Sequence, residues 1–582
     1  MKTFEGGLSR AADLSLIGIG SLALFGWAAR GPDYYNFDEG VYAEIAREIA
    51  RTGQLLTPRC NGVPYFEKPP LIYWFSALSF RLFGTTTWAG RLPIVLFGAI
   101  GVVALYWLMA LWRNQTAARA ASVCLATSFG YFIYARTLMM DAPLTALFVV
   151  AMAAFFSAWR RPERARPMLA LTAASLGMAV MVKGLIGIAL PVLAAAIAGT
   201  FSTDLRAFLK RIGWRGGLMM AAIFVAVAAP WHLLVEIRHP HAMNHYLVAG
   251  QLRRYLEGAD SLDVVPLGVG AYLGATAAWF MPWVIFLPPA IATALWEARR
   301  RSPDRDLLIA ALAWSFTAVA FFIVSPARLE YYALPALPGL AILVGYWWSR
   351  VELPSAAARN CFAAMLVVAT LGWIATLAVA HAPIFDRLYA VLNEQYRNAS
   401  GAVQPSFAEL TPAVIIELIA LTSAGFLGLF AVRHARRRMA FVSMLALAIV
   451  SNWAVHRGLE VMEPYSSVAP LAHDIAKTIA PNDAVVIMGP FEAAAPVAFY
   501  LRRRVMIVDG LGGDLRQGRE MDAATNRYFL DDASLNRLWN RSGRRVYLVI
   551  VNGDPAADPP PPTPAWRLQE MPSGALYSNR PR

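Results

Sequence analysis

A pair of carboxylates near the start of the chain stands where it could do chemistry. Asp38 and Glu39 precede a run in which apolar residues recur every fourth position, which predicts an amphipathic helix ended by Gly53 and lying at a membrane interface. The N-terminus of a helix favours an ionised carboxylate, so Asp38 could act as a general base or stabilise developing positive charge. The alternative is that Asp38 only caps the helix, since Asp is a favoured cap residue.

The segment YFEKPP at residues 65–70 holds an acid and a base on a stiff stretch of chain. Its two prolines force an extended backbone and remove two amide donors. Lys68 is a compact cation suited to a phosphate, and Tyr65 and Glu67 stand beside it. A solvated ion pair between Glu67 and Lys68 is the alternative.

Further charged residues stand at the ends of apolar runs. Arg136 and Asp141 flank the segment TLMM, and Lys183 precedes a glycine between two apolar runs. Ionisable groups near membrane depth are costly and usually functional. The alternatives are that Arg136 pairs with Asp141 and that Lys183 reaches out to the interface.

The segment PARLEYY at residues 326–332 is a short link between two apolar runs. It brings together Arg328, Tyr331 and Tyr332, and an arginine with two tyrosines aimed at one face could clamp a phosphate. The same residues could instead anchor the chain at the membrane interface.

Metal and disulfide chemistry have little support in the sequence. His239, His241 and His245 lie close together, but their spacing fits no known zinc motif. Three cysteines in 582 residues are too few and too scattered for a disulfide framework. The chain also has no Walker loop. We therefore expect no metal and no cofactor.

The composition predicts a polytopic membrane protein that carries these residues in its loops. Of 582 residues, 58% are apolar and only 15% are charged, whereas soluble domains have roughly 25% charged residues. A bilayer core of about 30 Å needs roughly 20 apolar residues in a helix. Residues 71–83 are apolar but too short to span, and we expect an interfacial helix there. The thirteen predicted spans are residues 14–30, 92–112, 117–135, 142–159, 168–182, 185–201, 216–235, 266–295, 306–324, 333–349, 361–381, 413–432 and 439–456.

The short loops between these spans predict how the chain is oriented. If Lys2 and Arg10 are cytoplasmic, every second loop is basic, as the positive-inside rule requires. Orientation then explains the net charge of +14 better than nucleic acid binding does. The first outer loop, residues 31–91, and the other polar sites described above all fall on the outer face. Such a set of carboxylates, cations and aromatic residues suits a lipid-linked phosphate substrate.

Residues 457–582 differ in kind from the membrane part, residues 1–456. The runs DAVVIMG, RVMIVDG and RVYLVIV are rich in β-branched residues and alternate with helical stretches, which predicts a small α/β domain. An odd number of spans puts this domain outside the cytoplasm. The expected helices cover residues 466–480, 491–502 and 527–540.

These residues resemble a known enzyme family, the bacterial lipid A aminoarabinose transferases. Those enzymes are part of the protein O-mannosyltransferase-like superfamily of GT-C glycosyltransferases. The likeness is specific in the first outer loop and covers roughly residues 1–350. The matching segments are DEGVYAEIARE at residues 38–48, YFEKPP, Tyr73-Trp74 and, more weakly, Arg136…Asp141, residues 182–184 and Pro230-Trp231.

The resemblance implies an inverting glycosyltransferase of the GT-C fold that uses a polyprenyl-phosphate sugar donor. It implies that Asp38 is the essential acid, with Asp141 as the second catalytic candidate. Lys68 and Arg328 are the implied ligands of the donor phosphate. The residues implied to line the substrate site are Glu39, Tyr65, Glu67, Lys183, Tyr331 and Tyr332.

The chain departs from the family pattern in two places. Aminoarabinose transferases usually read Asp-Glu-Thr-Arg-Tyr where this chain has DEGVY at residues 38–42, and they carry a Glu-His pair where this chain has Gly250-Gln251. The first departure leaves the sugar and the acceptor open. The second removes a possible metal ligand, in line with the expectation of no required metal.

We therefore expect an enzyme of the bacterial inner membrane that moves 4-amino-4-deoxy-L-arabinose from undecaprenyl phosphate to a lipid A phosphate. Transfer of another lipid-linked sugar to a protein or a different envelope glycan is the alternative within the class. A lipid transporter or flippase is the alternative from another class. Transport favours charges at mid-membrane and broken helices in paired positions, whereas the charges here gather at the outer ends of the spans.

Overall fold

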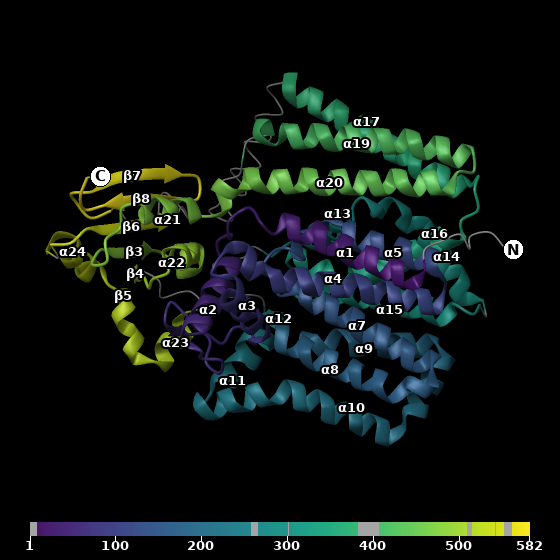
Figure 1. Cartoon of the computed structure of the whole chain (residues 1–582), viewed down its shortest axis with the longest axis horizontal. Helices are drawn as coiled ribbons and strands as arrows, with labels where there is room; N and C mark the ends of the chain where they lie inside the picture. The colour runs from purple at the N-terminus through teal and green to yellow at the C-terminus, as the bar shows by residue number, and fades with distance from the viewer. Residues whose placement is uncertain are drawn as a thin grey trace.

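The computed structural model of the chain describes residues 9–257, 266–300, 302–381, 405, 407–508, 515–541, 543–551 and 561–581. Its helices form a bundle, and a smaller α/β domain covers one end of that bundle (Figure 1). The long helix α20 (Arg437–Ser466) leads from the bundle into this domain. A multi-pass helical architecture with a C-terminal α/β region, as predicted from the sequence, is confirmed.

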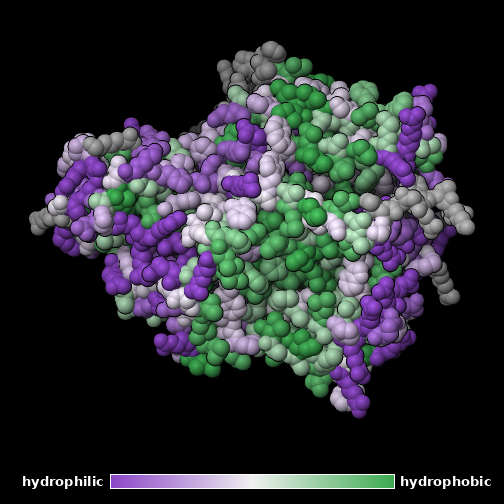
Figure 2. Space-filling view, in the orientation of Figure 1, coloured by the Kyte–Doolittle hydropathy of each residue, from purple (hydrophilic) through white to green (hydrophobic). Residues whose placement is uncertain are grey.

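Nine helices in the described part of the chain are long and apolar enough to cross a membrane. Figure 2 shows a broad apolar surface over the bundle, with hydrophilic side chains gathered over the α/β domain and at the opposite end. The helices are α1 (Arg10–Ala28), α4 (Thr87–Trp112), α7 (Asp141–Arg160), α8 (Ala165–Lys183), α10 (Thr203–Arg238), α15 (Arg305–Val324), α17 (Ala356–His381), α19 (Phe407–Arg433) and α20.

The remaining predicted spans correspond to broken or shorter helices. α13 (Val269–Trp279) and the stretch that contains α14 (Leu287–Arg299) meet at 97°. The predicted count of thirteen spans therefore stays a prediction. The shorter helices are α5 (Gln115–Thr127) followed by α6 (Phe129–Tyr134), α9 (Ile186–Phe201), and η4 (Glu330–Ala336) followed by α16 (Leu337–Arg350).

The first outer loop folds against the end of the bundle. α2 (Asp38–Thr52) ends where predicted, because Gly53 has a φ of 75° and takes the left-handed conformation that closes a helix. A short hairpin of β1 (Arg59–Cys60) and β2 (Val63–Pro64) follows, and then α3 (Leu71–Phe83).

The polar face of α2 is covered by protein rather than exposed to solvent, and the location of this helix at a membrane interface stays a prediction. Glu44, Arg47 and Glu48 are only 0%, 6% and 2% exposed. Arg47 donates to both carboxylate oxygens of Glu44. The cover comes from α3 and β1 of the first outer loop and from α22 (Ala495–Leu501) of the C-terminal domain, all of which pack on α2.

The C-terminal domain is built on a six-stranded mixed sheet of order β5-β4-β3-β6-β8-β7. The first four of these strands are parallel and the last two pair antiparallel. The three β-branched runs form β3, β4 and β6, as predicted, whereas the third predicted helix is shorter than expected. The strands are β3 (Ala484–Met488), β4 (Met506–Val508), β5 (Phe529–Leu530), β6 (Val546–Val551), β7 (Trp566–Met571) and β8 (Gly574–Ser578), and the other helices are α21 (Ala469–Ala476), α23 (Leu515–Met521) and α24 (Asp532–Arg541).

Candidate active site

A cavity of about 840 Å³ lies where the first outer loop, the bundle and the C-terminal domain meet. Part of its wall is apolar and comes from α9, α13 and α15. An apolar wall beside a group of charged side chains suits an amphipathic ligand. The polar residues that line the cavity are Asp38, Tyr42, Lys68, Asp141, Lys183, Gln251, Arg254, Tyr255, Ser325, Glu330, Tyr331, Tyr332 and Glu492.

Asp38 is the first residue of α2, and its carboxylate is not a helix cap. The cap position is Phe37, and no side chain caps the helix there. Instead, the Tyr42 hydroxyl donates to Asp38 Oδ1 at 2.6 Å. Burial and the Asp38 carboxylate raise the pKa of Tyr42, so this hydroxyl stays a donor. The capping alternative is therefore wrong, and the carboxylate faces the cavity.

Asp141 and Lys183 form an ion pair inside the cavity. Lys183 Nζ lies 2.6 Å from Asp141 Oδ1. The ammonium group also lies over the rings of Tyr331 and Tyr332, 5.1 and 4.9 Å from their centroids. Since cations bind the faces of aromatic rings, these contacts hold Lys183 in the site. Lys183 thus lines the cavity rather than reaching away from it.

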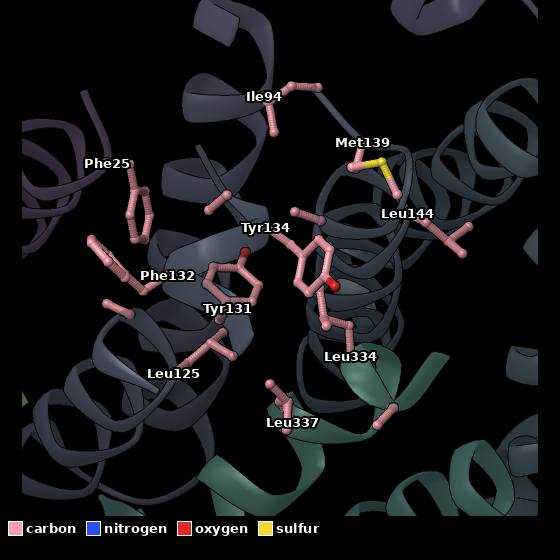
Figure 3. Packing of buried hydrophobic residues seen from close by; sticks show 14 of the residues in the cluster. Phe25, Ile94, Leu125, Tyr131, Phe132, Tyr134, Met139, Leu144, Leu334 and Leu337 are labelled. Carbon is pink, nitrogen blue, oxygen red and sulfur yellow. The ribbon is translucent and has the colours of Figure 1, made fainter. Parts of the chain in front are cut away.

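Arg136 does not pair with Asp141, so that alternative is also wrong. Its side chain is buried and donates to the carbonyls of Ala28 and Gly31, both at 3.2 Å. The segment after Arg136 carries Met139 into buried packing between Tyr134 and α7 (Figure 3). Arg136 therefore joins the segment before Asp141 to the C-terminal end of α1.

Glu39 was expected to contact substrate, but its carboxylate points away from the cavity. Oε1 accepts from Arg91 at 2.7 Å and from the Leu138 amide at 2.8 Å. Oε2 accepts from Arg91 at 2.8 Å and from the Tyr35 amide at 3.1 Å. These four bonds use the carboxylate fully, which leaves Glu39 a structural role.

Two cations of the cavity come from segments far apart in the sequence. Lys68 lines it, as predicted, and Arg254, which was not predicted, lines it as well. Burial acts to lower the pKa of Arg254, but the neighbouring Tyr332, Tyr331 and Asp38 raise it. The basic run of residues 252–255 was the only signal in the sequence for this arginine.

Arg328 does not line the cavity, contrary to its expected role as a phosphate ligand. Its guanidinium donates to the carbonyls of Leu267 at 2.7 Å, Ser325 at 2.5 Å and Ile323 at 3.2 Å. These bonds fasten the link before η4 to the start of α13. The arginine that meets the cavity is Arg254 instead.

Tyr65 and Glu67 also stand outside the cavity lining. Tyr65 is buried, and its amide donates to the Pro58 carbonyl at 2.9 Å. Glu67 is half-buried, and its charge is among those that raise the pKa of Arg254. Neither residue lines the cavity, although Glu67 acts electrostatically on Arg254, which does.

Two carboxylates in the cavity were not predicted. Glu330 accepts from the Tyr134 hydroxyl at 3.3 Å, and burial, with Asp141 and Asp38 nearby, raises its pKa. Glu492 belongs to the C-terminal domain and is 2% exposed. The sequence offered no signal for Glu492, because only the fold brings that domain to the cavity.

In the described part of the chain no three His, Cys, Asp or Glu side chains are grouped so that they could hold a metal ion. His239 lies in contact with Thr57, whose Oγ1 is 2.8 Å from Nε2. The charged groups that line the cavity are therefore carboxylates, ammonium groups and a guanidinium.

Known proteins with similar sequences are lipid-dependent transferases. Residues 31–246 match the family described as dolichyl-phosphate-mannose-protein mannosyltransferase. An undecaprenyl phosphate-alpha-4-amino-4-deoxy-L-arabinose arabinosyl transferase of Pectobacterium carotovorum is 28% identical over 315 residues, or 54% of this chain and 54% of that protein. Its counterpart in Aeromonas hydrophila is 26% identical over 434 residues, or 72% and 73%. The chain thus spans about half the length of the first of these relatives.

The fold matches over almost the whole chain. ArnT from Cupriavidus metallidurans bound to undecaprenyl phosphate superposes with a TM-score of 0.77 at 23% identity, over 98% of this chain and 99% of that one. The chain has the GT-C fold of ArnT. The apo form of that protein agrees, with a TM-score of 0.75 at 24% identity. The resemblance to the aminoarabinose transferases, predicted from the first outer loop, is confirmed.

Within this ArnT-like fold, one cavity gathers six of the ten site residues that the sequence predicted. It brings together Asp38, Lys68, Asp141, Lys183, Tyr331 and Tyr332 and leaves out Glu39, Tyr65, Glu67 and Arg328.

Proposed function

We propose that this protein is an inverting glycosyltransferase that moves a sugar from a polyprenyl-phosphate donor to an acceptor in the bacterial envelope. The observation that carries the proposal is that Asp38, Lys68 and Arg254 line one cavity. Cations stabilise the negative charge of a departing phosphate, and a carboxylate stabilises the positive charge that develops at the carbon under attack. The named activity of the sequence relatives supports undecaprenyl phosphate as the carrier.

The donor phosphate binds between Lys68 and Arg254, which supply an ammonium and a guanidinium. A phosphate leaving group carries its own negative charge, so it needs no proton from an acid. The isoprenoid chain lies along the apolar wall, where Phe321 and Phe322 of α15 and Ala271 of α13 face the cavity. This wall keeps water away from the charged end and strengthens the electrostatic contacts there.

Asp38 acts at the anomeric carbon. Toward an acceptor hydroxyl it serves as general base. Toward an acceptor phosphate, which is already ionised near neutral pH, it acts by orientation and by stabilising oxocarbenium-like charge. Its hydrogen bond from Tyr42 fixes the carboxylate in one position. Asp141 and its partner Lys183 form the other charged wall of the site.

The charges of the cavity support an amino sugar, and with it 4-amino-4-deoxy-L-arabinose transferred to a lipid A phosphate. Four carboxylates and three cations line the cavity, and a bound donor adds a further negative charge. An ammonium group on the sugar offsets that excess, because buried charges need partners. The carboxylates are Asp38, Asp141, Glu330 and Glu492, and the cations are Lys68, Lys183 and Arg254.

The proposed location is the bacterial inner membrane, with the N-terminus in the cytoplasm. Residues 1–456 form the membrane part, and residues 457–582 form a periplasmic domain. The alternation of basic loops supports this orientation. The cavity then opens at the outer leaflet, where a lipid-linked donor and lipid A meet.

The proposal is tested by deleting the gene and comparing lipid A by mass spectrometry. We expect the deletion strain to lack a pentosamine on a lipid A phosphate, and wild-type protein but not the Asp38→Asn variant to restore it. Unchanged lipid A together with a lost sugar on a protein or another glycan would favour the second candidate function. That candidate has support from the match to protein mannosyltransferases.

A further inference from the structure

The segment that leads into Asp38 is held by the C-terminal part of the chain. All five consecutive amides of residues 33–37 donate hydrogen bonds, and only Tyr35 donates to a neighbour in the first loop, Glu39. The other four are Asp33 to Glu463 Oε1 (2.9 Å), Tyr34 to the Tyr500 hydroxyl (3.0 Å), Asn36 to the Ser466 carbonyl (2.9 Å) and Phe37 to the Glu492 carbonyl (2.7 Å).

The C-terminal part also donates in return. The Ser467 hydroxyl donates to the Tyr34 carbonyl at 2.6 Å, and the Val468 amide donates to Asn36 Oδ1 at 3.0 Å. The Tyr500 hydroxyl donates to Asp33 Oδ1 at 3.0 Å. Both the backbone and the side chains of residues 33–37 therefore form hydrogen bonds with the C-terminal part of the chain.

Phe37 needs this support because its backbone is strained. Its φ of 60° and ψ of −131° are values that a residue with a side chain rarely adopts. The Glu492 carbonyl accepts its amide, and Phe37, Asp38 and Glu492 line the same cavity. Relaxation of Phe37 would turn the first residue of α2, and with it the Asp38 carboxylate.

The C-terminal domain approaches α2 so closely that only glycine fits between them. A Cβ at Gly40 would lie 2.6 Å from Pro496 Cδ and 2.9 Å from Pro496 Cγ. In this chain the glycine and the proline ring therefore form a matched contact two residues from Asp38.

We propose that the C-terminal domain is a positioning part of the active site: Glu492, Pro496 and Tyr500 hold Phe37 and Gly40 so that Asp38 faces the reacting carbon. This inference rests on the proposed transferase activity. It gives the α/β domain a role in the rate of transfer and not in holding the donor phosphate, which contacts Lys68 and Arg254.

The test introduces a methyl group at the contact and then makes room for it. In purified full-length protein, Gly40→Ala should lower kcat by about tenfold to a hundredfold, because small displacements of a reacting group have effects of that size. The KM for the lipid donor and the affinity for undecaprenyl phosphate should change little. Adding Pro496→Ala removes the two nearest ring atoms and leaves only the backbone nitrogen of residue 496 at 3.1 Å, so it should restore a large part of kcat.

Two further variants provide a matched control and a second test that does not depend on the folding of Gly40→Ala. Gly458→Ala in α20, where a Cβ meets nothing within 4 Å, is the matched control and should behave as wild type. If Gly40→Ala does not fold, Tyr500→Phe should give the same selective loss of kcat, because it removes the hydroxyl that contacts Tyr34 and Asp33 and, besides them, Thr87. Wild-type kcat in a folded Gly40→Ala or Tyr500→Phe protein would overturn the inference. A wild-type protein inactive on this donor would instead refute the proposed function.

Discussion

Arg91 donates to both carboxylate oxygens of Glu39, at 2.7 and 2.8 Å, and both side chains are almost completely buried. The same carboxylate accepts the amides of Tyr35 and Leu138. One ion pair therefore joins the segment before Asp38 to the segment before Asp141. The relative position of Asp38 and Asp141 therefore depends on Glu39, which does not line the cavity.

The Glu39→Gln variant should unfold at a markedly lower temperature than the wild type. The change leaves the buried Arg91 charge uncompensated, and breaking a buried pair costs about 3–5 kcal/mol. Thermal unfolding in detergent measures the effect. Glu520→Gln is a suitable control, because Glu520 sits in an exposed pair with Arg516. Equal melting temperatures for the two variants would mean that the ion pair of Glu39 with Arg91 does not stabilise the fold.

Lys68→Ala and Arg254→Ala should each weaken the binding of undecaprenyl phosphate. A hydrogen bond to a charged group contributes about 1.5–3 kcal/mol, which corresponds to a loss of affinity of roughly tenfold or more. Arg253→Ala, at the exposed neighbouring position, should bind as wild type. A binding titration with the lipid in detergent compares the three. If Arg254→Ala binds undecaprenyl phosphate with undiminished affinity and Arg328→Ala binds it more weakly, Arg328 is the ligand of the phosphate and Arg254 is not.

Asp141 and Lys183 should show a strong energetic coupling. The ion pair is largely shielded from water, so removing either partner leaves a charge in a poor environment. In a double-mutant cycle of Asp141→Ala and Lys183→Ala, followed by chemical unfolding, the coupling should reach about 1–3 kcal/mol. Additive effects of the two changes would show that the contact contributes nothing to stability.

The contact between Asp33 and His473 should make the docking of the C-terminal domain depend on pH. The hydrogen bond to Asp33 raises the pKa of His473. Its stabilising effect is therefore complete below the unfolded value of about 6.5 and is lost as the pH rises through the higher folded value. Burial acts to raise the pKa of Asp33, but His473 lowers it overall, so the Asp33 contribution is lost only at acidic pH, below the unfolded value of 3.8.

The matching measurement follows thermal unfolding between about pH 6 and 8.5, the range around the unfolded histidine value. The wild type should lose stability across this range, and His473→Gln should lose less. An identical pH dependence in both proteins would rule out His473 as the titrating group.

The sequence predicted the elements that carry a local signal. The helix from Asp38 to Gly53 was visible because its apolar period and its terminal glycine are local features. Lys68 was visible because it stands between an acid and two prolines. The strands of the C-terminal domain were visible from their β-branched runs.

The parts that were missed depend on contacts between distant segments. Arg328 and Arg254 carry the same guanidinium, and only the fold decides that three carbonyls occupy Arg328 while Arg254 lines the cavity. Glu39 stands next to Asp38 in sequence, yet the turn of a helix directs it to Arg91. Glu492 had no signal, since its role depends on how the C-terminal domain docks.

The most direct test of the central claim is a single-turnover assay of sugar transfer with purified protein and a lipid-linked donor, comparing the wild type with Asp38→Asn. The variant keeps the size of the side chain and an oxygen that can accept from Tyr42. We predict that the rate falls by a factor of about 10² to 10⁴, as expected for the loss of a catalytic carboxylate, while the affinity for undecaprenyl phosphate stays unchanged. A transfer rate near that of the wild type would contradict the assignment of Asp38 and of the cavity as the active site.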